Sequence, residues 1–342
     1  MSTVSDKEEG LENSVAQAKA NSKRRSPRRQ RRSDCIQVQK ESSPLDQLKQ
    51  LLLKDDRQRI VVVSGAGISQ SAGLSTFSDD KKGLYAQAGK RFGLSDGSHV
   101  FRYRFLKDRP SDCFQFFYKL YQQAIQAKPT LSHKALQNLM NQGRIQHHFT
   151  LNIDGLHAHA HAHDSQSASA SASASAIELH GTLHQLVCPK CTKVFSTAEI
   201  LPVVPSQPKK RKRYSIPPTC PHCNDTTTRL RFRILMYNDE QPNLIWDHDP
   251  LDNNNNLQHV SAVLWIGISF QQQASCAHFQ KVWEATKRNH QMAQPIHYII
   301  NPNANEALQD LQSVVGHLGP TNVVTVEATS DDLLESFAFS SD

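Results

Sequence analysis

The stretch RIVVVSGAGISQSAG, residues 59–73, decides the fold of this chain. Its consecutive, mostly β-branched apolar residues predict a strand that is buried on both faces, as in a parallel sheet. The glycine-rich turn that follows leads into a predicted helix, whose first main-chain N–H groups could face a pyrophosphate. Gly65 and Gly67 alone are a weak indication, because the same spacing occurs in turns without a ligand. No acidic residue ends a second strand about 20 positions later, so a dehydrogenase fingerprint is not supported.

Strand and helix patterns alternate through the rest of the chain. Ser43-Pro44 can cap a helix, and Leu45, Leu48, Leu51 and Leu52 then share one face. This alternation predicts an α/β fold with a parallel sheet. Further strands are expected at 145–152, 176–179, 234–237, 260–269, 296–301 and 323–326, and helices at 44–55, 113–127 and 277–289.

Length and charge exclude some classes of protein. The 342 residues suffice for one large or two ordinary domains. No apolar run approaches the roughly 20 residues that span a bilayer, and the polar N-terminus lacks a signal-peptide core, so we expect no membrane partner and an intracellular location. The formal charge is +7 from 39 Lys plus Arg and 32 Asp plus Glu, a mild excess that permits a nucleic-acid partner without establishing one.

The basic charge is concentrated in two segments. Residues 1–42 have little apolar periodicity and predict a disordered basic tail. Residues 1–40 contain 10 basic and 5 acidic side chains and Lys209–Arg213 adds five basic ones, which leaves −3 for the rest of the chain. Each basic run can be a solvated loop, a nuclear-import address or a phosphate contact.

Four cysteines form two C-x-x-C pairs. Cys188 and Cys191 are separated from Cys220 and Cys223 by 28 residues, and a proline lies inside each pair. Two such pairs can close a tetrahedral four-thiolate zinc site. Because four thiolates leave no open position, the expected zinc is structural.

Low-complexity sequence interrupts the pattern at residues 157–176, where His alternates with Ala and Ser-Ala repeats follow. Alternating imidazoles could collect metal ions, but expansion of a surface loop is the simpler interpretation. We therefore predict an insertion over 157–176.

Polar residues follow two of the predicted strands. Asn152 and Asp154 lie in TLNIDGLH, residues 150–157, and His180 lies in ELHG, residues 178–181. Ligands of open parallel sheets bind at strand ends, so a general base at His180 is plausible. Spacing alone leaves this open.

Taken together, these motifs resemble those of sirtuins. Within that family, Gly83-Leu84-Tyr85 after the glycine-rich loop and the long zinc insertion look most like the fungal nuclear histone deacetylases. The matching blocks are GAGIS-x-x-AG (65–73), PTLSH (129–133), TLNIDGLH, ELHG, the two C-x-x-C pairs, WIGIS (265–269) and IINPN (299–303). The resemblance implies a catalytic domain over 43–335. Its Rossmann-type NAD part would comprise about 43–183 and 233–335, and its zinc module about 184–232.

The resemblance further implies an NAD-dependent protein-lysine deacetylase that acts on histones in the nucleus and releases nicotinamide and O-acetyl-ADP-ribose. His180 would deprotonate a ribose hydroxyl, Asn152 and Asp154 would position the ribose and carboxamide, and Phe77 would cover the nicotinamide site. The peptide would add as a strand beside Met236–Glu240, and the basic segments could contact chromatin or DNA. The remaining implied NAD contacts are Gly65, Ala66, Gly67, Gly267, Ser269 and Asn301.

Some residues depart from the resembled family. Thr76 and Ser78 replace an Asp and an Arg, and Leu151 replaces a Gln. Ile268 replaces a Thr, and Asn238 occupies a glycine position. Loss of a charged hydrogen bond costs about 1.5–3 kcal/mol, so two alternatives stay open: a catalytically impaired chromatin-binding module, and a protein mono-ADP-ribosyltransferase.

Overall fold

The computed structural model describes residues 42–53, 59–77, 79, 81–164, 175–202, 216–223, 225–252, 257, 259–287, 293–316 and 322–338. The predicted tail before Ser42, the Lys209–Arg213 cluster and residues 165–174 of the predicted insertion lie outside these ranges. Within them, no helix has both the length and the apolar character needed to cross a membrane.

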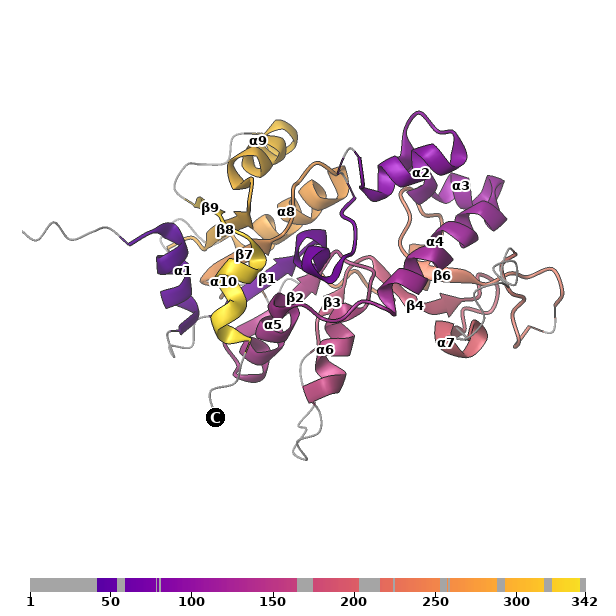
Figure 1. The fold of residues 1–342 in the computed structure, drawn as a ribbon, viewed down its shortest axis with the longest axis horizontal. Coiled ribbons are helices and arrows are strands. Elements are labelled where there is room, and N and C mark those ends of the chain that lie inside the picture. Colours follow the sequence, from indigo (N-terminus) through magenta and orange to yellow (C-terminus); the bar gives the residue numbers. More distant parts are fainter. Residues whose placement is uncertain are drawn as a thin grey trace, which may run out of the picture. The chain divides into compact units, whose positions relative to one another are not determined.

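A six-stranded parallel sheet organises the larger part of the fold, in the order β3-β2-β1-β7-β8-β9 (Figure 1). Successive strands run outward in one direction from β1 and in the other from β7, so the order reverses between these two strands. Parallel sheets of this kind bind ligands at that reversal, beyond the carboxyl ends of the strands. The predicted α/β fold is confirmed. The strands are β1 (Ile60–Ser64), β2 (Ile145–Thr150), β3 (Ile177–Glu178), β7 (Ala262–Ile266), β8 (Ile296–Asn301) and β9 (Val323–Glu327).

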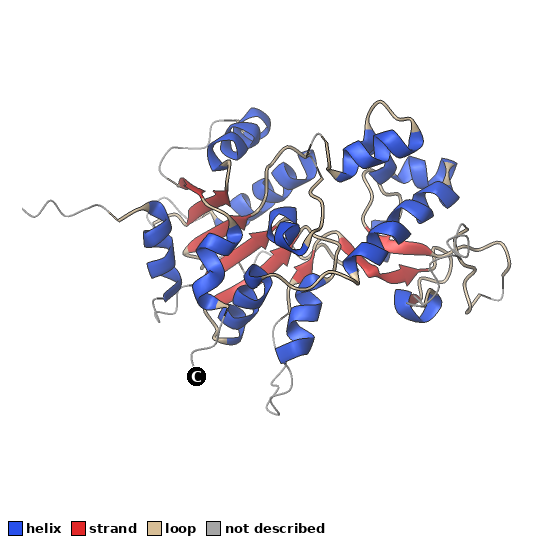
Figure 2. Ribbon diagram, in the orientation of Figure 1, coloured by secondary structure: helices blue, strands red, loops and turns tan. Residues whose placement is uncertain are grey.

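Helices cover both faces of this sheet (Figure 2). Ile60 and Val62 of β1 pack into one core with helices α1, α5 and α10, whereas Val61 and Val63 pack into a second core with α8 and α9. This two-sided burial explains why β1 is apolar at consecutive positions. The helices are α1 (Pro44–Leu53), α5 (Leu131–Asn141), α8 (Gln273–Thr286), α9 (Ala304–Val315) and α10 (Ser330–Leu334), and the short η5 (Glu335–Phe337) follows.

A smaller module combines a three-stranded antiparallel sheet with a group of helices and has an aromatic core. Phe101 packs edge to face against Phe77, Phe116 and Phe117, with ring centroids 5.4–5.6 Å apart. Its strands are β4 (Gly181–Val187), β5 (Val194–Ser196) and β6 (Arg231–Ile234). Its helical elements are α2 (Leu84–Phe92), η2 (Gly97–Phe101), α3 (Tyr103–Asp108), α4 (Pro110–Ala124) and α7 (Thr197–Ile200).

Two sequence predictions differ from the structure. The strand expected at 234–237 lies at 231–234, and Tyr237 forms only an isolated parallel bridge with Arg102. The surface loop expected from residue 157 begins instead as a helix, because α6 spans Leu156–Asp164; the insertion over 157–176 stays a prediction. His157 is 6% exposed and its Nε2 lies 3.3 Å from Ser64 Oγ, so this residue belongs to the core. Alanine has the highest helix propensity, and here the His-Ala alternation starts as helix.

Three buried histidines meet behind the glycine-rich turn. Ser64 Oγ lies 2.9 Å from His148 Nε2, and the His157 ring centroid lies 4.3 Å from that of His148 and 4.5 Å from that of His133. Burial lowers the pKa of His148 to about 3 and that of His133 to about 4. On β8, burial likewise lowers the pKa of His297 to about 3. These side chains are therefore neutral in the folded protein at neutral pH.

The free energy of unfolding is expected to fall as the pH drops below about 6.5. The unfolded chain takes up protons on these histidines from about pH 6.5 downward, whereas the folded chain resists until pH 3–4. Over this range, each fully buried histidine lowers the free energy of unfolding by about 1.4 kcal/mol for every unit by which the pH falls. Urea unfolding at a series of pH values measures this slope. His148→Gln should reduce it; a flat profile between about pH 7 and pH 5 would contradict the assignment.

Candidate active site

A cavity of about 450 Å³ opens at the carboxyl edge of the parallel sheet. Every strand of that sheet contributes lining residues from the segment that follows it. This is the ligand position expected from the reversal of strand order between β1 and β7. The lining residues, in strand order β3 to β9, include His180, Asn152, Gly65, Gly267, Asn301 and Thr329.

The glycine-rich turn after β1 lies against the turn after β7. Gly67 N donates to Gly267 O at 2.9 Å, and a Cβ on Gly67 would come within 2.6 Å of Gly267 Cα. Gly267 itself has φ +68°, a left-handed conformation that favours glycine. The sequence therefore needs glycine at both positions so that the two turns can approach. The short helix η1 (Ala66–Ala72) begins at this contact, and Ala66 lines the cavity.

Asn152 is held in place by its amide nitrogen, while its amide oxygen has no partner among the described residues. Its Nδ2 donates to Gly65 O and to Ser69 Oγ, both at 3.2 Å. Ser69 Oγ in turn donates to Asp154 Oδ2 at 2.8 Å. Asn152 Oδ1 is buried and accepts no hydrogen bond from any described residue. Because a buried acceptor without a donor is costly, this oxygen is suited to a donor on a ligand.

Asp154 lies behind Asn152 and does not line the large cavity. Its Oδ1 accepts from Leu156 N at 3.0 Å, so both carboxylate oxygens are engaged by the protein. It does line an adjoining cavity of about 50 Å³, together with Ala66, Phe77 and Asn152. The structure thus brings Asp154 together with three of the predicted cofactor residues in this side cavity.

His180 follows β3 and faces the large cavity. Its Nδ1 lies 3.0 Å from Leu151 O, and its Nε2 lies 3.0 Å from Nε2 of His278 on α8. Burial lowers the pKa of His180, so the ring is neutral at neutral pH. The main chain is fixed as well, because Leu235 N donates to His180 O at 2.9 Å. Sequence reasoning missed His278, since nothing in its helical context distinguishes it from an ordinary surface histidine.

The end of the cavity nearest the smaller module is aromatic. Phe77, Tyr85, Phe101 and Tyr237 line it, and the hydroxyls of Tyr85 and Tyr237 lie 3.2 Å apart. Burial raises the pKa of Tyr85, which keeps its phenol neutral. Aromatic walls with the neutral phenol of Tyr85 suit an uncharged chain that ends in a polar group.

The segment after β6 differs from the predicted peptide-binding strand at 236–240. Tyr237 N donates to Phe101 O at 2.8 Å, and Tyr103 N donates to Tyr237 O at 2.9 Å. The N–H groups of Met236 and Asp239 are also used, by Asp239 Oδ2 and Met236 O respectively. A peptide therefore finds no free N–H donor on these three residues. Leu235 and Met236 still line the cavity, so a peptide side chain can reach past this segment.

A buried ion pair shapes that segment. Arg231 donates to both carboxylate oxygens of Asp239, at 3.1 and 2.5 Å, and the two side chains are 6% and 1% exposed. Asn238, the residue before Asp239, adopts φ +55°. Asn tolerates this conformation better than most residues with a side chain. The replacement of a glycine by Asn238 is thus accommodated.

The altered residues of the glycine-rich loop are partly placed. Thr76 lines the cavity, whereas Ser78 lies outside the described residues. Asp79 also lines the cavity, and its carboxylate accepts the N–H groups of Lys81 and Lys82 at 2.9 and 2.7 Å. Both lysines are exposed and neither lines the cavity, so neither replaces the missing guanidinium in this structure.

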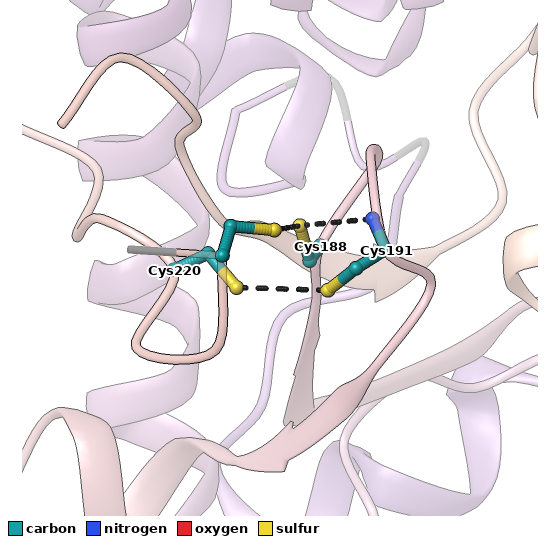
Figure 3. A group of neighbouring side chains, drawn as sticks. Cys188, Cys191 and Cys220 are labelled. Atoms are coloured by element: carbon teal, nitrogen blue, oxygen red, sulfur yellow. Dashed lines mark hydrogen bonds between the residues drawn. The ribbon is translucent and has the colours of Figure 1, made fainter. Parts of the chain in front are cut away.

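The four C-x-x-C cysteines converge within the smaller module, and their sulfurs all lie within 4.8 Å of one another. Figure 3 shows Cys188, Cys191 and Cys220 turned toward one another. Cys188 Sγ lies 3.6 Å from Cys223 Sγ, and Cys191 Sγ lies 3.7 Å from Cys220 Sγ. A tetrahedron of thiolates with Zn–S bonds of about 2.3 Å has sulfurs about 3.8 Å apart. The cluster therefore fits zinc and leaves no open ligand position.

A model of the Sir2 family matches residues 65–274, more than half of the chain and the region that carries this cavity. The chain belongs to the Sir2 family. Two Sir2 relatives are similar to it: the NAD-dependent histone deacetylase HST4 of Saccharomyces cerevisiae, 26% identical over 201 residues, and the NAD-dependent protein deacetylase hst4 of Emericella nidulans, 27% identical over 205 residues. These matches cover 54% and 55% of this chain but only 52% and 33% of the relatives, so the chain spans about half or less of their length.

Solved Sir2 structures share the fold. The crystal structure of a Sir2 homolog–NAD complex has a TM-score of 0.58 at 18% identity, and covers 86% of this chain and 91% of its own. The structure of Sir2Tm bound to a propionylated peptide has a TM-score of 0.55 at 20% identity, and covers 86% of this chain and 96% of its own.

Proposed function

We propose that this Sir2 family chain is an NAD-dependent protein-lysine deacetylase. The observation that carries the proposal is the lining of one cavity, which combines the glycine-rich turns, His180 and Asn152. Asn152 Oδ1 is buried there and has no hydrogen-bond partner among the described residues. The family membership and the deacetylase names of its relatives support the same activity.

The residues present fit NAD. Gly65 and Gly67 line the large cavity without side chains, which leaves room for a pyrophosphate beside the main chain at the start of η1. Gly267, Ser269 and Asn301 line the same cavity beyond the sheet reversal, where they would hold the adenosine half. Asn152 Oδ1 would accept from a ribose hydroxyl, and Phe77 and Asp154 would enclose the nicotinamide in the adjoining cavity.

NAD, when bound, supplies an activated ribose carbon at which the acyl oxygen of the substrate can displace nicotinamide. The chain's own residues do the rest. The aromatic end of the cavity excludes water from the acyl chain. This exclusion matters because an amide oxygen is a poor nucleophile and has to be positioned and sheltered to react. His180 is neutral, so it can accept a proton from a ribose hydroxyl at its Nε2. The cysteine cluster would hold a structural zinc that supports the β4–β6 sheet.

Acetyl-lysine proteins, histones among them, are the substrates we propose, in the nucleus. The support is the name of the yeast relative, a histone deacetylase, together with the two basic runs in the sequence. An uncharged acyl-lysine side chain suits the aromatic channel between Phe77 and Tyr237. Contact of the basic runs with chromatin or DNA belongs to the same proposal.

Mass spectrometry of the reaction products tests this function. Purified protein with NAD and an acetylated histone peptide is expected to give unmodified lysine peptide and O-acetyl-ADP-ribose in equal amounts. ADP-ribose attached to a protein side chain instead would show a mono-ADP-ribosyltransferase. Saturable peptide binding with no product would show an impaired chromatin-binding module.

Gly67→Ala is expected to weaken NAD binding by at least about tenfold. The added Cβ would lie 2.6 Å from Gly267 Cα, so the two turns that form the pyrophosphate cradle must separate. Calorimetric titration with NAD measures the affinity, and thermal unfolding shows whether the fold is intact. Wild-type affinity in a folded Gly67→Ala protein would remove the glycine cradle from the proposed NAD site.

A further inference from the structure

A second histidine lies directly against the proposed general base. His278, in the second turn of α8, places its Nε2 3.0 Å from Nε2 of His180. The ring centroids are 5.1 Å apart and the planes are tilted by 46°. The first turn of the same helix, at Ala274 and Ser275, lines the large cavity. His278 thus approaches His180 from the helix that borders the proposed NAD site.

The proton positions of the pair follow from the acceptor at its other end. Leu151 O can only accept, so His180 must carry a proton on Nδ1, 3.0 Å away. In a neutral ring His180 Nε2 then holds a lone pair, and His278 must donate its Nε2–H to it. This leaves His278 Nδ1 unprotonated, and that atom is buried with no hydrogen-bond partner among the described residues.

We propose that His278 is a positioning residue that fixes His180 as its Nδ1–H tautomer and occupies the Nε2 lone pair until a substrate hydroxyl takes its place. Because this hydrogen bond is made only to neutral His180, it opposes protonation of the base. The consequence for turnover rests on the proposed function, whereas the tautomer and the titration of His180 do not.

The charged groups around His278 do not substitute for this contact. Asp249 and Lys281 face it, and they pair with each other. Lys281 also pairs with Asp252 at 3.1 Å. The carboxylate of Asp249 is further occupied by Leu251 N at 3.0 Å. Asp249 raises the pKa of His278 and Lys281 lowers it, so their effects oppose each other. The hydrogen bond of the His278 ring is made to His180 instead.

Nuclear magnetic resonance of histidine-labelled, ligand-free protein tests the proposal without any turnover. The ring-nitrogen shifts of wild type are expected to show Nδ1–H for His180 and Nε2–H for His278. In His278→Leu the midpoint of the His180 titration should rise by roughly one pH unit. In His278→Gln, whose amide can still donate, the midpoint should return toward wild type. Gln280→Leu, an exposed position on the same helix, should leave it unchanged.

Two results would overturn the role of His278. One is an Nε2–H tautomer for His180 in the wild-type protein, which can be read even if the variants fail to fold. The other is a His180 midpoint that does not move in a folded His278→Leu protein. In the proposed reaction, the midpoint of the acid limb of the pH–rate profile should move to higher pH by the same amount in His278→Leu. Absence of turnover in wild type would reject the proposed function and leave the resonance result standing.

Discussion

Cys220→Ser is expected to lose stoichiometric zinc and the folded β4–β6 sheet. Three thiolates would remain where four sulfurs now lie within 4.8 Å. Metal binding supplies about 10–16 kcal/mol in small zinc modules, comparable with the whole free energy of unfolding of a typical domain, about 5–15 kcal/mol. Cys188 directly follows β4. Cys220 follows Thr219, which forms an isolated bridge with Arg229 just before β6, so a bound metal would join the two strands. Elemental analysis and limited proteolysis measure the loss.

The matched control is Cys113→Ser. Cys113 is buried in α4 and is not part of the sulfur cluster, so this variant should keep one zinc per chain even if it is somewhat less stable. A chelator should reproduce the Cys220→Ser result in wild type. A wild-type protein that contains no zinc, or a Cys220→Ser protein with unchanged protease resistance, would contradict a structural zinc site.

Asp239→Ala is expected to destabilise the protein by about 3–5 kcal/mol. Among the described residues, the change would leave the buried Arg231 guanidinium with Ile234 O at 2.9 Å and the Tyr103 ring as partners. The N–H groups of Met236 and Gln241 would lose their acceptor too, at 3.2 and 3.0 Å in the structure. Denaturant unfolding measures the change.

An exposed ion pair provides the control for Asp239. Arg104 and Asp108 lie 3.3 Å apart with side chains 88% and 60% exposed. Asp108→Ala should therefore cost at most about 0.5 kcal/mol. If Asp239→Ala costs no more than Asp108→Ala, the buried pair does not hold the segment that borders the cavity.

The sequence predicted the parts of the fold that depend on local pattern. Val61 to Val63 are apolar on consecutive positions because both faces of β1 are covered, and the cysteine spacing indicated a four-thiolate site. The strand after the second cysteine pair was placed three residues late. Its position depends on pairing with Val187 and on the ion pair of Arg231, neither of which leaves a local signal.

The candidate site was predicted in part, for the same reason. Motif residues such as Asn152 and His180 line the cavity as expected, since strand ends gather at one edge of a parallel sheet. The sequence could not show that Asp154 lies behind Asn152, or that His278 meets His180 across 98 positions. His157 was assigned to a loop because composition hid its contact with Ser64 in the core.

Release of nicotinamide tests the central claim most directly. Wild-type protein, NAD and an acetylated histone peptide are incubated together, and free nicotinamide is measured over time against His180→Ala. We expect peptide-dependent release by wild type and a rate about 10²–10⁴-fold lower in His180→Ala, the usual contribution of a general base. Release by wild type that does not exceed the level of His180→Ala would contradict an NAD-dependent deacetylase.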